Sequence, residues 1–139
     1  MKYLSINEAI TLHDDIMDTM DGLKGFDKSR VAYLESALEH IKNDDFYPSF
    51  LDKLTHLMFC CVKFHPFLDG NKRSAIYLAK AFIKLNVPQS LPNDFYTKLE
   101  NIVVNVASDE MSKEQLRDFL ANLLSLQNDK NALESKKNI

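Results

Sequence analysis

The chain has 139 residues, of which 45% are hydrophobic and 27% are charged, and its formal net charge is −3. This balance predicts one globular domain and excludes a disordered chain. No apolar run approaches the roughly 20 residues of a membrane span, no secretory signal is expected at the start, and there is no basic footprint for direct nucleic-acid binding. The two cysteines, Cys60 and Cys61, are adjacent, which indicates reduced thiols in a cytoplasmic protein and not a disulfide framework.

Two helices are predicted before residue 43. Ser5 and Glu8 form a capping box in front of a helix that runs to about Met20, with apolar residues at helical spacing. His13 lies on that apolar stripe, which favours a hydrogen-bonded core histidine over a functional role. After a glycine-containing loop, Asp27 caps a second helix. The apolar face of this second helix consists of Val31, Leu34, Leu38 and Ile41.

The next segment, residues 43–49 (NDDFYPS), breaks the helical pattern with Asn, Asp and Pro. Phe46 and Tyr47 are equally consistent with exposed aromatic residues that contact a partner and with residues that pack inward. A short β-hairpin here is compatible with the sequence. No other segment has a convincing strand pattern, and the chain contains no repeats and no low-complexity tract.

Two apolar helices are predicted on either side of residues 65–73 (HPFLDGNKR). The third helix spans residues 50–64 and ends directly before His65. The fourth helix, at about residues 72–85, is apolar over most of its circumference, so we expect it at the centre of the bundle. A pair of buried helices would fix the geometry of the loop that joins them.

Residues 65–73 combine several chemical groups in a short turn. Gly70 allows a positive φ without steric cost, so the turn is expected at this residue. The helix that begins there has unpaired backbone N–H groups and the positive end of its dipole, which together form an anion site. Lys72 and Arg73 add positive charge. Asp69 can hold Mg²⁺ through oxygen, and His65 supplies an imidazole, the side chain suited to accepting a proton near neutral pH.

Two further helices and a tail complete the pattern. Asn93 or Asp94 can cap a fifth helix that carries apolar residues up to about position 106. Ser112 begins a second capping box, in front of a sixth helix. We expect one domain at residues 1–126, followed by a polar tail at residues 127–139 that frays.

Three other chemistries have weaker support. His13 and Asp14 match metal-dependent HD phosphohydrolases at two residues, but those enzymes need an upstream His and none occurs in the first twelve residues. His56 and Cys60 have the i, i+4 spacing of metal ligands, without further ligands at suitable spacing. A Ser or Cys hydrolase is not supported, because the sequence has no nucleophile elbow.

The nine residues 65–73 resemble the signature of the Fic/Doc superfamily, and of its Doc (death-on-curing) branch in particular. Lys72 stands where nucleotide-transferring Fic proteins usually carry Gly, and Ile76 where they usually carry a second Arg. The resemblance also includes residues 3–14 (YLSINEAITLHD), 25–38 and 82–86, and covers about residues 3–125. An isolated Asp-Gly-Asn would suit an ordinary connector between helices, whereas nine ordered matches between apolar helices are specific.

The resemblance implies an all-α bundle of about six helices that transfers a phosphoryl group from ATP to a protein hydroxyl. The implied site residues are His65 as the base, Asp69 as the Mg²⁺ ligand, Gly70 and Asn71 as the anion cradle, and Lys72 and Arg73 as the phosphate clamp. Phe67 is expected to anchor the loop in the core. In this family a flap between the second helix and the motif receives the target protein, which suggests Phe46 and Tyr47 as target-binding residues.

The resemblance also implies partners. Doc-type proteins are toxins of toxin–antitoxin pairs that phosphorylate translation elongation factor Tu, and a small antitoxin blocks them by folding its C-terminal tail onto the toxin. Some Fic proteins carry a built-in brake, a Ser or Thr followed four residues later by Glu. This chain has no such pair, so we expect inhibition in trans by a partner that folds on binding.

Two alternative functions remain for the same motif. The first is AMP transfer (adenylylation), as in Fic proteins proper, against which Lys72 and Ile76 argue. The second is a catalytically silent module that binds an antitoxin or regulator. The motif argues against that module, because its residues are intact: His65, Asp69, Asn71 and Arg73.

Overall fold

The computed structural model of the protein describes residues 1–126, so the tail predicted at residues 127–139 lies outside the described residues. The described elements are α1 (Ile6–Met20), α2 (Lys28–His40), α3 (Phe50–Phe64), α4 (Asn71–Asn86), the 3₁₀ helix η1 (Pro88–Ser90), α5 (Phe95–Ala107) and α6 (Lys113–Leu123). Within residues 1–126 no strand forms, and the single β-type pairing is an isolated antiparallel bridge between Phe26 and Phe67. The prediction of a six-helix, all-α domain is confirmed.

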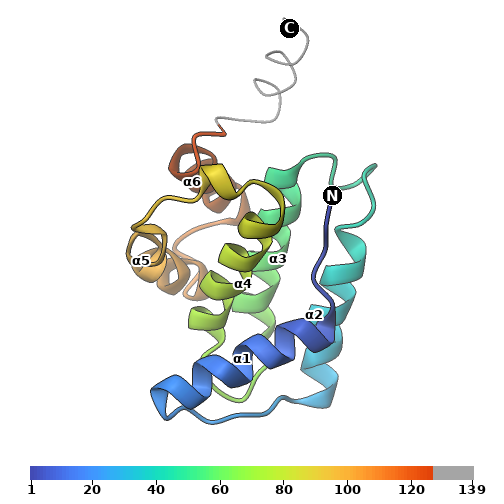
Figure 1. Cartoon of the computed structure of the whole chain (residues 1–139), viewed down its shortest axis with the longest axis vertical. Helices are drawn as coiled ribbons and strands as arrows, with labels where there is room; N and C mark the ends of the chain where they lie inside the picture. Colours follow the sequence, from blue (N-terminus) through green and yellow to red (C-terminus); the bar gives the residue numbers. More distant parts are fainter. Residues whose placement is uncertain (127–139) are drawn as a thin grey trace, which may run out of the picture.

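The antiparallel helices α3 and α4 form the centre of the bundle (Figure 1). α2 and α6 pack against α3, α5 packs against both central helices, and α1 crosses α4 near the loop that joins α3 to α4. The sequence correctly placed α4 at the centre, and α3 shares that position. None of the described helices is both long and apolar enough to cross a membrane.

Side-chain caps explain most of the helix starts. Ser5 and Ser112 both form complete capping boxes, and the Asp27 carboxylate accepts hydrogen bonds from two backbone N–H groups of the first turn of α2. The Ser49 side chain also caps α3, by accepting the Asp52 N–H, and the sequence pattern did not predict this cap. Asp94 precedes α5, but its side chain makes no capping hydrogen bond, because its ψ of 22° is far from the extended geometry of a cap.

The segment that joins α2 to α3 is held by a buried lysine. The Lys53 ammonium donates to the Ile41 carbonyl at 2.5 Å and to the Asp44 carboxylate at 2.7 Å. This pairing satisfies the ammonium and fastens residues 41–49 to the first turn of α3. Residues 43–49 form turns and no hairpin.

A second polar cluster lies between α3 and α6, around His56. The Lys113 ammonium lies 2.7 Å from His56 Nδ1, and the Tyr47 hydroxyl and the Cys60 thiol lie 3.3 and 3.5 Å from Nε2. Burial and the neighbouring Lys113 and His40 lower the pKa of His56 to about 4, while burial raises the pKa of Cys60 to about 11. Near neutral pH the His56 imidazole is therefore neutral and the Cys60 thiol is protonated. Their contact is one of packing and not an ion pair.

The alternative of a metal site at His56 and Cys60 has no support from this geometry. In residues 1–126, no group of three or more His, Cys, Asp or Glu side chains could hold a metal ion. Both cysteines are buried and unpaired, in agreement with the prediction of reduced thiols.

We predict that the protein loses stability as the pH falls from about 6.5 to about 4, the range between the ordinary and the lowered pKa of His56. The unfolded chain binds a proton in this range before the folded protein does, so the penalty is absent above pH 6.5 and complete below about pH 4. Because the ring is half-buried and partly screened, the loss is about 1–3 kcal/mol. Urea unfolding at about pH 7 and about pH 4.5 measures it.

The control is His56→Gln, which cannot titrate. Its free energy of unfolding should fall less between the two pH values than that of the wild-type protein. Equal losses in the two proteins would assign the pH dependence to other groups.

Candidate active site

Two residues with left-handed backbone conformation bound the loop between α3 and α4. His65 ends α3 with a φ of 48°, and Gly70 precedes α4 with a φ of 71°. His is among the non-glycine residues that tolerate this region. A Cβ there would lie 2.4 Å from the Met17 Cε on α1, which is the far end of a flexible side chain and would have to shift. The backbone conformation is therefore the reason that the loop requires glycine at this position.

The Asn71 side chain closes the loop. Its Oδ1 accepts from the Phe67 N–H and its Nδ2 donates to the Phe67 carbonyl, both at 2.9 Å. These two bonds use both polar groups of the Asn71 side chain within the loop. The group of Asn71 that can bind an anion is therefore its backbone N–H. The first hydrogen bond of α4 begins with the Ser74 N–H, and the N–H groups of the residues before it have no partner within the helix.

The core below the loop contains two stacked rings. Phe67 is 3% exposed, in agreement with its prediction as an anchor, and its ring stacks on His13 with centroids 3.8 Å apart. His13 Nε2 lies 2.7 Å from the Asp69 carbonyl. The prediction of a hydrogen-bonded core histidine is confirmed.

The loop between α1 and α2 lies against the motif, which the sequence did not reveal. The Leu68 N–H donates to the Gly25 carbonyl at 3.1 Å, and the Asp27 N–H donates to the Pro66 carbonyl at 3.2 Å. These two bonds form the isolated bridge. In the sequence, the one sign of this contact is the pair of glycines in the loop, Gly22 and Gly25. Glycines indicate a turn, but they do not show which other segment the loop packs against.

Phe46 and Tyr47, suggested as target-binding residues, lie far from this loop. They precede the N-terminal end of α3, whereas His65 follows its C-terminal end, and a helix of 15 residues is about 22 Å long. Phe46 is 78% exposed, while Tyr47 is partly buried against His56. The structure does not bring these two residues to the motif.

A cleft of about 380 Å³ opens beside the N-terminus of α4. Its lining residues come from α1, the motif loop, α4 and α5: Met20, Asp69, Gly70, Lys72, Arg73, Ile76, Tyr96, Glu100, Val103 and Val104. Met20, the last residue of α1, is 39% exposed and its sulfur contacts the Arg73 guanidinium. The volume is within the range of small-molecule sites.

The cleft has a cationic end and an apolar wall. Lys72 is exposed and Arg73 is half-buried, and both lie in the first turn of α4, where the helix dipole adds to their charge. Ile76 and two valines of α5 form the apolar part of the wall, and the Glu100 carboxylate of α5 also lines the cleft. The Arg73 guanidinium lies 5.7 Å from the centre of the Tyr96 ring. Such a site suits a polyanion with an attached aromatic group.

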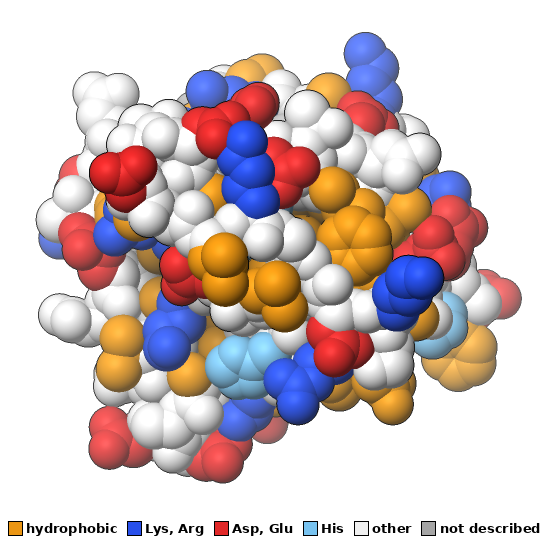
Figure 2. All heavy atoms as spheres, turned by 90° about the horizontal axis from the view of Figure 1, so that it is seen from below, with side chains coloured by type: hydrophobic (Ala, Val, Ile, Leu, Met, Phe, Trp, Pro, Cys, Tyr) orange, Lys and Arg blue, Asp and Glu red, His pale blue; other side chains and the backbone are white. Residues whose placement is uncertain are grey.

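Asp69 and His65 are the other two side chains of the loop that the sequence predicts to act in the site. The Asp69 Oδ2 accepts the Leu23 N–H at 3.0 Å, which orients the carboxylate and leaves Oδ1 for a cation. No cluster of three protein ligands exists among the described residues, so a Mg²⁺ ion here would need oxygens from a nucleotide. His65 is exposed and is not among the residues that line the cleft. Figure 2 shows this end of the molecule, where cationic, acidic and apolar side chains lie close together.

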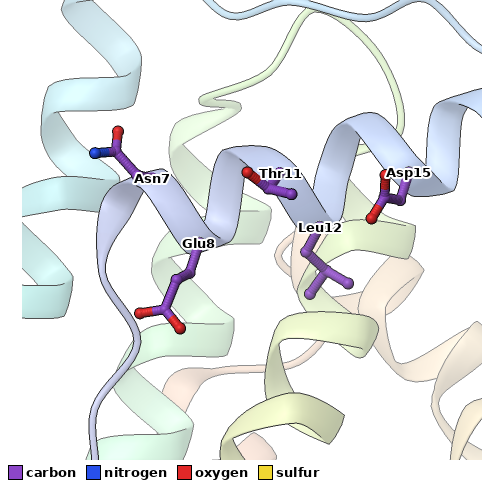
Figure 3. Close-up of a pocket in the computed structure, with 5 residues that line it drawn as sticks. All are labelled: Asn7, Glu8, Thr11, Leu12 and Asp15. Carbon is purple, nitrogen blue, oxygen red and sulfur yellow. The ribbon is translucent and has the colours of Figure 1, made fainter.

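Another hollow, of about 390 Å³, runs along the outer face of α1 (Figure 3). Its lining residues are Asn7, Glu8, Thr11, Leu12 and Asp15. None of them is a cation, and two are carboxylates. This surface therefore does not suit a phosphate ligand, in contrast to the cleft beside α4.

Comparisons with known proteins agree with the motif. The model of the Fic/DOC family matches residues 3–83, which is more than half of the chain and includes α1 to α3, the motif loop and most of α4. A search of curated proteins finds no significant match. The matched segment contains every residue of the loop and all of the α4 residues that line the cleft. The chain therefore belongs to the Fic/DOC family.

Proposed function

We propose that this protein is a Doc-like phosphotransferase, which moves the γ-phosphoryl group of ATP to a hydroxyl group of a protein. The observation that carries the proposal is the pair at positions 72 and 76. Lys72 places an ammonium at the start of α4, and Ile76, which is 1% exposed, leaves the next turn of α4 without a cation in the cleft. All the cationic groups that line the cleft therefore lie at its α4 N-terminal end, next to the loop that carries His65.

This arrangement favours one orientation of the nucleotide. The inner phosphates contact the N–H groups of the first turn of α4 together with Lys72 and Arg73. The nucleoside then lies along the α5 wall, where Tyr96 offers a ring for stacking. The γ-phosphate lies nearest to His65. In the opposite orientation the outer phosphates would meet the uncharged wall at Ile76.

The reaction follows from these positions. His65 accepts the proton of the target hydroxyl as its oxygen attacks the γ-phosphorus, and the bond between that phosphorus and the β–γ bridging oxygen breaks, which releases ADP. Asp69 would hold the Mg²⁺ that accompanies the nucleotide, and the ion would supply positive charge against the phosphates. Lys72, Arg73 and the helix amides stabilise the charge on the transferred group and on the departing ADP.

The biological role follows from the family branch that the motif resembles. The protein acts in the cytoplasm as the toxin of a toxin–antitoxin pair, with elongation factor Tu as its substrate, and it blocks translation. A small antitoxin that folds on binding holds it inactive. AMP transfer by the same site is the competing reaction, and an inactive regulator-binding module is the competing non-enzymatic role.

The first prediction separates the reactions by the position of a radioactive label. Bacterial lysate is incubated with the protein, Mg²⁺ and ATP labelled at the α or the γ position. We expect label from the γ position in protein and none from the α position, because His65 meets the terminal phosphate. Entry of the α label alone would establish AMP transfer in its place, and entry of neither would support the inactive module.

The second prediction concerns the base. His65→Ala should lower label transfer by at least about 100-fold, since a general base contributes that much or more. Because His65 is exposed, unfolding stability should change by less than about 1 kcal/mol. Expression of the wild-type chain should slow bacterial growth, and expression of the variant should not.

His65→Asn is the matched control for the loop, because Asn also tolerates a positive φ. It should be as inactive as His65→Ala. Transfer at the wild-type rate by either folded variant would remove His65 from the mechanism.

The third prediction concerns Lys72. Lys72→Gly should weaken phosphorylation and admit some AMP transfer, because it removes a cation and leaves room for the opposite orientation of the nucleotide. Lys72→Met keeps most of the stem volume without the charge, so it should weaken phosphorylation without admitting AMP transfer. Adding Ile76→Arg to Lys72→Gly should increase AMP transfer further.

Label transfer from both positions of ATP is measured for each variant, together with thermal unfolding, because Ile76 is buried. Unchanged γ-label transfer in both Lys72 variants would show that this side chain does not bind the phosphates.

A further inference from the structure

His13 on α1 contacts the motif loop in two ways. Its imidazole is 1% exposed and stacks on Phe67 at 3.8 Å with an angle of 7° between the ring planes. Its Nε2 lies 2.7 Å from the Asp69 carbonyl oxygen. Because a carbonyl oxygen can only accept, Nε2 carries the proton and donates it.

The same helix contacts the loop again one turn later. Met17 lies four residues after His13, on the same face of α1. Its Cε occupies the space in which a Cβ of Gly70 would lie, and its Sδ does the same at Gly22. The Leu23 N–H, just beyond the end of α1, binds the Asp69 carboxylate. Residues 69 and 70 are thus held from the α1 side at the carbonyl, at the carboxylate and at the glycine Cα.

Packing alone does not explain a histidine at position 13. Its Nδ1 is buried and has no hydrogen-bond partner in the described part of the chain, and the nearest carboxylate oxygen, of Asp14, is 3.6 Å away. A buried polar atom without a partner is unfavourable, so an apolar ring such as Phe would fill the space without this cost. What the histidine adds is the Nε2–H bond to the loop.

That bond determines where the next N–H group points. The C=O and N–H of a trans peptide point in opposite directions, and no cis peptide bond occurs in residues 1–126. With the Asp69 carbonyl turned toward His13, the N–H of Gly70 points away from α1. Gly70 lines the cleft.

We propose that His13 is a positioning residue of the active site. It fixes the orientation of the Asp69–Gly70 peptide, and thereby orients the Gly70 N–H to bind the nucleotide and the Asp69 carboxylate to bind the metal ion that accompanies it. Its effect on catalysis rests on the proposed phosphotransfer. Its effect on the loop does not. His13 acts through residues 69 and 70 and does not itself contact the substrate.

Three substitutions separate the ring from its N–H group. His13→Phe keeps the stacking on Phe67 and leaves the Asp69 carbonyl without a donor. His13→Gln loses the ring, but its amide N–H reaches about as far as Nε2. His13→Asn is too short to reach the carbonyl. Leu120→Ala, at a fully buried position on α6, is the control for general destabilisation.

Two measurements are made below the unfolding temperature of every variant. The first is γ-label transfer, divided into kcat and the KM for ATP. We expect kcat to fall by about 10- to 100-fold in His13→Phe and His13→Asn, with a smaller change in KM, because misplacing a reacting group by about 1 Å has an effect of this size. His13→Gln should recover a large part of the loss. Leu120→Ala should keep the wild-type kcat per folded molecule.

The second measurement is amide hydrogen exchange of residues 66–72, which does not require activity. Exchange in this segment should become faster in His13→Phe and His13→Asn than in the wild-type protein, and remain unchanged in Leu120→Ala. Unchanged exchange and kcat in His13→Phe would overturn the proposal, and so would a loss in His13→Gln as large as in His13→Asn. If His13→Phe does not fold, the Gln and Asn variants decide. If the wild-type protein transfers no label while exchange responds as expected, the proposed function fails and the positioning role stands.

Discussion

The backbone reversal between α3 and α4 is the constraint on which the rest of the site depends. Both helices are buried over most of their length, so neither can shift to suit the loop. The chain must turn within a few residues, and it does so with left-handed conformations at His65 and Gly70. The Asn71 side chain then fills the inside of the turn and pairs with both polar groups of the Phe67 backbone. The buried helix pair thereby positions the exposed imidazole of His65 and the N-terminus of α4 at the same end of the bundle.

The first turn of α4 differs in charge from the molecule as a whole. The net charge of the chain is −3, yet the first turn of α4 carries two consecutive cations together with the positive end of the helix dipole. Neither Lys72 nor Arg73 forms an ion pair within the part of the chain that the structure describes. Their charge therefore remains available to a ligand. Two carboxylates also line the cleft, Asp69, which accepts the Leu23 N–H, and Glu100 on α5.

Local signals predicted the helices well. Apolar spacing placed α3 at its observed bounds, and the serine and aspartate caps were correct at Ser5, Asp27 and Ser112. These features depend on residues within one or two turns of one another, so a single sequence contains them. The sequence offered Asn93 or Asp94 as the cap of the fifth helix. Asp94 precedes α5, but its ψ of 22° is not the extended conformation of a capping residue and its side chain makes no capping hydrogen bond.

The parts that the sequence did not predict are contacts between distant segments. The pairing of residues 25–27 with residues 66–68 joins two loops that have no shared periodicity. The suggestion of a flap at Phe46 and Tyr47 relied on order along the chain, while a helix of 15 residues separates that segment from the motif. His13 was correctly expected in the core, but its partner, a carbonyl 56 residues away, could be identified only in three dimensions.

Positions 72 and 76 differ in how freely they can change without affecting the fold. Lys72 is exposed, so the fold places little restriction on its side chain. Ile76 packs in the core at 1% exposure while one side of it lines the cleft. A charged residue there would have to pass its stem through the packing between α4 and α5 to reach solvent, at the cost of displacing apolar contacts. The absence of a cation in the second turn of α4 is therefore tied to the stability of the bundle, whereas the ammonium in the first turn is not. Under the proposed mechanism, a change from phosphoryl to AMP transfer would require one substitution that the fold tolerates and one that the core must accommodate.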